Sequence, residues 1–300
     1  MGVSFYKIKK WYKMLAGKSI SHVNQGVGKY YSKKEIAGYY NDLTEKVTKD
    51  DPSIFVPQYY VDTGEKIYFP IGIFQYGLAA YDLFLQTGEE IYKEKLIACA
   101  DWAVNKQEEN GGWSTFLYKS PEHPYSSMAQ GEGISLLIRA YKEKQDEKYL
   151  SACHSAKNFM LVPIEDGGTT KYQDKDIFLY EFTHDPLVLN GWIFSAWGLL
   201  DYSKWFADKE IADIYFRIVE TIKKTLSNYD TGYWSKYDIQ KRIASPFYHN
   251  LHIAQLRVMY DLTGDEIFNK YADLFESYSN KSINRSRAFI VKALQKIFEK

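Results

Sequence analysis

The chain has 300 residues, with 38 basic and 38 acidic side chains, so its formal net charge is zero. A composition of 45% hydrophobic and 25% charged residues is that of a globular protein and excludes a disordered or collagen-like chain. The lack of a basic surplus argues against nucleic acid as a partner. The two cysteines are too few for a disulfide framework or a cysteine-rich zinc site.

No run of about 18 apolar residues occurs, so we expect no membrane span. Residues 1–17 are basic but contain no continuous apolar stretch, and they do not fit the pattern of a secretory signal. We therefore expect a cytoplasmic location. The sequence leaves open whether the chain acts alone or as a homodimer.

Aromatic side chains are abundant, with 27 Tyr, 17 Phe and 7 Trp. A bulky helical core is one explanation, and composition alone favours it. A sugar-binding groove is the other, because aromatic rings cover the apolar face of a pyranose while O–H and N–H groups reach its hydroxyls.

The first part of the chain differs from the rest. We expect one helix over 32–49 and a loop or hairpin over 51–69, where proline and glycine recur. We interpret 1–67 as an N-terminal extension and 68–300 as the main, catalytic domain.

An internal repeat begins after the extension, and each copy has an apolar helix, a short acidic turn and an amphipathic helix. The turn markers Gly88, Asp146, Asp208 and Gly264 recur at intervals of 58, 62 and 56 residues. In each turn we expect Gly or Asp to end the first helix, and acidic residues to face the positive end of the second. The apolar helices are expected over 71–85, 128–141, 187–205 and 248–262.

Helices that are apolar on most sides belong inside, whereas amphipathic, Lys-rich helices such as 212–226 belong outside. Their alternation predicts an all-α fold, an incomplete α/α toroid of about four helical hairpins. An open solenoid of stacked hairpins is the competing architecture. Glycine-rich return loops at 109–113, 165–169 and 229–234 lead to the next inner helix. We expect them over one mouth of the toroid, where function usually lies.

The first stretch with candidate functional residues is 124–133. It places Gln130 and Glu132 at the start of an inner helix, facing the expected mouth. Helix capping by Ser126 or Ser127 is the structural alternative.

The second stretch is 180–192, where Glu181 lies among aromatic residues just before an inner helix. Burial there raises the pKa of a carboxyl group, as a general acid or base requires. A surface salt bridge at the helix entry is the alternative. Asn190 and Gly191 interrupt an apolar run and indicate a close backbone approach or a polar contact.

The third stretch is 237–252. Tyr248 starts an inner helix, so its phenol can point into the mouth. His249 and His252 are three residues apart, but a zinc or iron site needs a third ligand that the sequence does not supply. A core histidine is the better explanation for one of them. We expect no metal, and no cofactor either, since no phosphate-binding glycine loop occurs.

Four segments resemble the D-glucuronyl C5-epimerase family, whose members convert glucuronate to iduronate within heparosan-type polysaccharides. The resemblance runs from about Tyr68 to about Tyr278 and implies an α/α toroid. It also implies an isomerase that acts on an anionic, uronate-containing polysaccharide. The segments are YFPIGIFQYG at 68–77, SMAQG at 127–131, VLNG at 188–191 and YHNLHIAQL at 248–256.

The resemblance assigns catalysis to Glu181, Tyr237 and Tyr248. Where the family has Tyr-Asp-x-Arg, this chain reads YDIQ at 237–240, so we expect Arg242 to replace the missing arginine. The residues expected to bind substrate are Tyr125, Gln130, Tyr180, Asn190, Arg242, His249 and His252.

Epimerisation removes the C5 proton beside a carboxylate and returns a proton from the opposite face, so two acid/base groups must flank C5. Glu181 with Tyr248 or Tyr237 could form such a pair. A tyrosine acting as base needs nearby positive charge, which we expect from His249, His252, Lys236 or Arg242.

Three alternatives stay open. A polysaccharide lyase removes the same C5 proton and expels the C4 oxygen. A uronyl hydrolase needs two carboxylates, such as Glu181 with Asp185 or Glu132. A non-catalytic glycan-binding protein needs the aromatic residues only.

Overall fold

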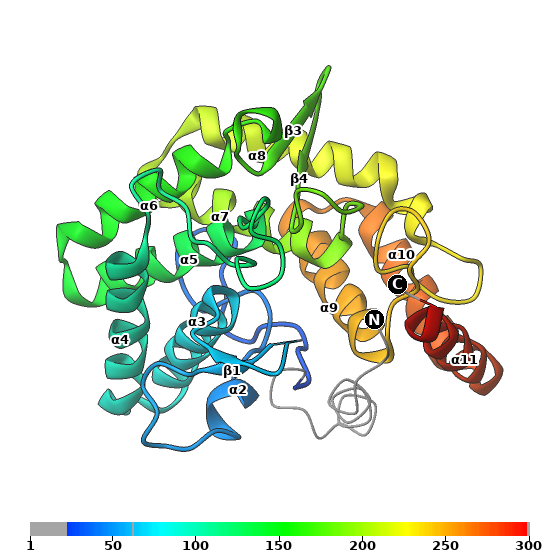
Figure 1. The fold of residues 1–300 in the computed structure, drawn as a ribbon, viewed down its shortest axis with the longest axis horizontal. Helices are drawn as coiled ribbons and strands as arrows, with labels where there is room; N and C mark the ends of the chain where they lie inside the picture. Colours follow the sequence, from blue (N-terminus) through cyan, green and yellow to red (C-terminus); the bar gives the residue numbers. More distant parts are fainter. Residues whose placement is uncertain (1–22, 62, 299–300) are drawn as a thin grey trace.

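Each sequence repeat forms a hairpin of one inner and one outer helix (Figure 1). This computed structural model describes residues 23–61 and 63–298. The inner helices are α3 (Pro70–Thr87), α5 (Ser127–Lys144), α7 (Leu189–Phe206) and α9 (Pro246–Thr263). The outer helices are α4 (Glu90–Lys106), α6 (Glu147–Met160), α8 (Lys209–Thr225) and α10 (Glu266–Ser279).

The hairpins are arranged side by side through their inner helices: α3 packs on α5, α5 on α7, and α7 on α9. Figure 1 shows the outer helices surrounding this inner set. The inner helices are buried over most of their length, as their apolar sequences require. The all-α fold is therefore an incomplete α/α toroid of four helical hairpins within the described residues, and the fold prediction is confirmed.

The turns within the four hairpins share one backbone geometry. The inner helix ends at a residue with left-handed backbone geometry, and an Asp or Glu follows. Asp146 and Asp208 do not end the inner helices, in contrast to the prediction. They cap the outer helices, and Asp146 accepts a hydrogen bond from the Lys148 N–H at 3.2 Å. The left-handed residues are Gly88, Gln145, Ala207 and Gly264.

The described part of the N-terminal extension contains less helix than predicted. Within 32–49 only α2 (Glu45–Thr48) forms, so the prediction of one long helix is wrong. Tertiary contacts replace helical hydrogen bonds here: the Tyr39 N–H donates to Asp82 Oδ1 of α3 at 2.8 Å, and the Tyr39 side chain is buried in the core. The basic segment 1–17 lies outside the described residues.

A short hairpin does follow in the extension, as predicted: β1 (Tyr59–Tyr60) pairs antiparallel with β2 (Lys66–Ile67). A second hairpin, β3 (Thr170–Gln173) with β4 (Asp176–Leu179), was not predicted because its strands are too short for a clear alternating pattern. It packs on α8, and its last strand leads directly to Glu181.

The remaining described elements are two 3-10 turns, η1 (Ile164–Asp166) and η2 (Leu226–Tyr229), and helix α11 (Ser282–Phe298). Helix α11 packs against α9 and α10. Of the helices in the described ranges, none combines the length and apolar character needed to cross a bilayer.

Candidate active site

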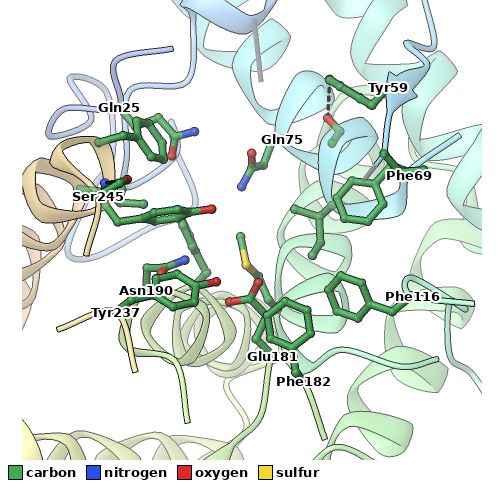
Figure 2. A pocket seen from close by; sticks show the side chains of 18 of the residues that line it. Gln25, Tyr59, Phe69, Gln75, Phe116, Glu181, Phe182, Asn190, Tyr237 and Ser245 are labelled. Atoms are coloured by element: carbon green, nitrogen blue, oxygen red, sulfur yellow. Dashed lines mark hydrogen bonds between the residues drawn. The ribbon is translucent and has the colours of Figure 1, made fainter. Parts of the chain in front are cut away.

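The N-terminal ends of the four inner helices meet at a cavity of about 340 Å³, a volume typical of ligand sites (Figure 2). Residues from the first turns of α3, α5, α7 and α9 line it, including Ile71 and Met128. Unpaired N–H groups at a helix N-terminus carry partial positive charge, so four such ends favour an anionic ligand.

Glu181 lies in the wall of this cavity, and the residue before it is bonded to the start of α5. The preceding residue, Tyr180, accepts a 2.9 Å hydrogen bond from the Ser127 N–H at the start of α5. Glu181 is 8% exposed, and its Oε2 atom has no hydrogen-bond partner among the described residues. Burial raises the pKa of Glu181 to about 8, although nearby Arg242 and Lys119 oppose that rise.

Gly191 explains how the carboxylate fits against α7. A Cβ atom on Gly191 would lie 2.5 Å from Glu181 Oε2, closer than any side chain permits. The glycine in the first turn of α7 therefore permits the close approach predicted from the Asn-Gly pair at 190–191.

Tyr237 and Tyr248 line the cavity beside Glu181, and their ring centroids are 4.8 Å apart. Tyr237 is fixed by its backbone, because its N–H donates to the Arg242 carbonyl at 2.6 Å. Burial and the charge of Glu181 raise the pKa of Tyr237 well above its usual range. Figure 2 shows Tyr237 and Glu181 pointing into the same space.

Arg242 also lines the cavity, on the loop that joins the two tyrosines. Its Nε donates to the buried carboxylate of Asp238, and its Nη2 donates to Asp185 Oδ2 at 3.2 Å. Its Cζ lies 5.5 Å from the centroid of the Tyr237 ring, so a fixed cation lies against that tyrosine.

Five of the predicted site residues meet at the cavity: Glu181, Asn190, Tyr237, Arg242 and Tyr248. The Oδ1 atom of Asn190 is buried and has no hydrogen-bond partner among the described residues. Buried polar atoms are rarely left unpaired. The Oδ1 atom of Asn190 and the Oε2 atom of Glu181 are therefore suited to accept hydrogen bonds from a bound ligand.

Tyr125, Gln130 and Tyr180 do not line the cavity. The Tyr125 hydroxyl donates to Glu108 at 2.6 Å. The Gln130 amide, in the orientation that satisfies both its ends, joins to the backbone of the return loop at 111–113, with both distances 3.2 Å. Tyr125 and Gln130 therefore stabilise the return loop, and their positions do not support a role in substrate binding.

His249 and His252 are core residues, and neither lines the cavity. His249 stacks on Trp234 with centroids 3.7 Å apart, and the Nδ1 atoms of both histidines bond to Ser235 Oγ, at 2.8 and 3.0 Å. Burial lowers their pKa values, to about 4 for His249 and about 3 for His252. Both are neutral near pH 7, so the expectation that they supply positive charge to a tyrosine is wrong.

The residue patterns did not identify an aromatic wall in the cavity. Phe116 stacks on Phe182 with centroids 4.4 Å apart, and Phe69 lies 6.0 Å from Phe116. Figure 2 shows all three rings on one side of the cavity. The aromatic-rich composition hinted at such a surface, but nothing in the local sequence indicated which rings form it.

Positive charge also gathers at the cavity, although the whole chain is neutral. Among the residues that the structure describes, four basic and two acidic side chains line it: Lys46, Lys119, Arg242 and Lys292, with Glu181 and Asp185. Across the described ranges, no group of three or more His, Cys, Asp or Glu side chains is placed to hold a metal ion.

The model of the D-glucuronyl C5-epimerase C-terminus matches residues 107–277 of this chain. The chain belongs to the D-glucuronyl C5-epimerase family. The D-glucuronyl C5-epimerase of Caenorhabditis elegans is 32% identical in an alignment of 219 positions that covers 63% of this chain and 36% of that protein. An uncharacterized protein of Methanocaldococcus jannaschii is 32% identical over 161 residues, 52% of each chain. The chain thus matches about a third and about half of these relatives' lengths.

The fold of this chain also has a weak similarity to the solved structures of two unsaturated glucuronyl hydrolases. The enzyme from Bacillus sp. GL1 has a TM-score of 0.47 at 12% identity, over 69% of this chain and 60% of that one. The enzyme from Streptococcus agalactiae has a TM-score of 0.46 at 16% identity, over 68% and 56%.

Proposed function

We propose that this protein is a polysaccharide D-glucuronate C5-epimerase, which inverts C5 of glucuronate to give iduronate within a polymer. The observation that carries the proposal is the placement of Glu181, Tyr237 and Tyr248 in one cavity of a member of this family. We also propose that 68–300 form the catalytic domain and that 1–67 are an extension joined to it.

Glu181 is the base of the proposed reaction. Its pKa is about 8, whereas that of Tyr237 is well above the usual tyrosine range, so Glu181 loses its proton first as the pH rises. The deprotonated carboxylate takes the C5 proton of glucuronate, and a tyrosine hydroxyl gives a proton to the opposite face of C5. In the reverse direction the two groups exchange roles.

The substrate proposed is an anionic polysaccharide of the heparosan type. Removal of the C5 proton places extra negative charge on the uronate carboxylate, and preorganised cations and helix N-termini stabilise such charge. The excess of basic side chains at the cavity supports an anionic ligand. The wall of Phe69, Phe116 and Phe182 supports a ligand with apolar ring faces.

Product analysis on a heparosan-type polymer tests the proposal against the lyase and the hydrolase. The epimerase yields iduronate with unchanged chain length. An unsaturated, ultraviolet-absorbing uronate would establish a lyase, new reducing ends would establish a hydrolase, and binding without any product would establish a glycan-binding protein. Any of these three results without iduronate overturns the proposed function.

A further inference from the structure

A second set of buried polar side chains borders the cavity on the side of α2 and α3. Lys46 of α2 and Gln75 of α3 line the cavity and are only 3% and 5% exposed. Glu132 of α5 is fully buried, and its Oε1 atom accepts a 2.7 Å hydrogen bond from Gln75 Nε2. Figure 2 shows Gln75 and Glu181 pointing into the cavity from different sides.

Lys46 and Glu132 influence each other's pKa. Burial lowers the pKa of Lys46 to about 8, and Glu132 opposes that fall. Burial raises the pKa of Glu132 well above its usual range, while Gln75 and Lys46 oppose that rise. The Oε2 atom of Glu132 has no hydrogen-bond partner within the described part of the chain.

Of the described basic side chains that line the cavity, only Lys46 is buried. Arg242 is half-buried and binds the carboxylates of Asp238 and Asp185. Lys119 is exposed to solvent. A cation stabilises developing negative charge most strongly where water is excluded.

On the basis of the proposed epimerase function, we propose that Lys46 binds the carboxylate of the uronate whose C5 proton is removed, with Gln75 and Glu132 as its positioning residues. The charge that develops on this carboxylate then lies beside a desolvated ammonium group. Lys46 belongs to the N-terminal extension, outside the 107–277 segment that matches the family. The extension thereby becomes part of the active site.

The test compares the full chain with its Lys46→Met variant, which keeps the length of the side chain and removes its charge. Binding is measured to a glucuronate polymer and to the same polymer with its carboxyl groups reduced to hydroxymethyl groups, and kcat and KM are measured separately. Lys49→Met is the matched control, because Lys49 is an exposed lysine at the end of α2 that pairs with Glu45 and does not line the cavity.

We expect the preference of Lys46→Met for the uronate polymer to fall roughly 10- to 100-fold, the usual worth of a charge-assisted hydrogen bond, and kcat to fall with it. Lys49→Met should behave as the unaltered protein. An unchanged preference and an unchanged kcat in folded Lys46→Met overturn the inference.

Lys46→Met removes a side chain that opposes the rise in the pKa of Glu132, so the single variant also changes the surroundings of Glu132. The double variant Lys46→Met/Glu132→Gln replaces both ionisable groups and is compared with Glu132→Gln alone. A loss of uronate preference in the double variant supports the inference, and equal preference in the two overturns it. If the unaltered protein prefers the uronate polymer but forms no iduronate, the proposed function fails while the binding comparison still decides the role of Lys46.

Discussion

Gly191, in the first turn of α7, lies directly against the carboxylate of Glu181, and a Cβ atom on Gly191 would be 2.5 Å from Oε2. The helix thus provides a space that only glycine leaves open. This contact holds the buried carboxylate at the cavity and ties the position of the proposed base to the start of an inner helix.

Gly191→Ala should displace Glu181 and lower turnover roughly 10²-fold, because a shift of about 1 Å in a reacting group costs that much. The protein should stay folded, as judged by circular dichroism and thermal melting. Gly26→Ala is the control, because a Cβ at Gly26 meets nothing within 4 Å. Wild-type turnover in Gly191→Ala would show that the position of Glu181 does not matter.

Glu181→Gln, Tyr237→Phe and Tyr248→Phe test the proposed acid/base groups. Glu181→Gln and at least one of the two tyrosine variants should lose roughly 10²- to 10⁴-fold in kcat, the usual worth of a positioned proton-transfer group. Tyr125→Phe should keep near-normal turnover, because Tyr125 does not line the cavity. Folded Glu181→Gln with normal epimerase turnover would refute the assignment of the base.

The pH dependence of kcat/KM follows from Glu181 as the base. Its pKa in the folded protein is about 8, above the ordinary 4.5, so at neutral pH most molecules hold the inactive, protonated carboxyl group. We expect kcat/KM to rise with pH towards pH 8, by up to about tenfold per unit, and to fall again above it, where Lys46 loses its proton. A flat profile between pH 5 and pH 8, measured in buffers of constant ionic strength, would show that a different group is the base.

The fold could be predicted because its determinants are local and repeated. The apolar helix, acidic turn and amphipathic helix recur at a near-constant spacing, and each copy indicates the same hairpin without any long-range information. The helix predicted over 32–49 failed for the opposite reason. The residues of this segment bond instead to helices far along the chain: the Tyr39 N–H donates to Asp82 of α3, and Arg139 of α5 donates to the Gly38 carbonyl.

The candidate site could be predicted only in part. Glu181, Tyr237 and Tyr248 were identified through the family resemblance, and they meet at one cavity beside the N-terminal ends of inner helices. Lys46 and Phe116 carry no local signal, because their role depends on which segments meet across the toroid. The prediction that His249 and His252 supply positive charge was wrong for a physical reason. A His-x-x-His pair at a helix start does not show that Trp234 and Ser235 will enclose it in the core.

The buried histidines predict a loss of stability in acid. The pKa of His252 is about 3 in the folded protein and 6.5 ordinarily, so the unfolded chain binds more protons below pH 6.5. Stability should therefore fall as the pH drops below 6.5. His252→Gln, which can still hydrogen-bond to Ser235, should show a weaker fall in melting temperature between pH 6.5 and pH 4.5. An equally steep fall in the variant would exclude His252 as the cause.

The central claim is that two different groups, a carboxylate and a tyrosine, act on opposite faces of C5. The most direct test follows the reaction on a heparosan-type polymer in deuterated water, at early times, by NMR of both uronates. The account predicts deuterium at C5 of the newly formed iduronate, while the remaining glucuronate keeps its C5 hydrogen. Deuterium appearing equally in both uronates, or no iduronate at all, would contradict it.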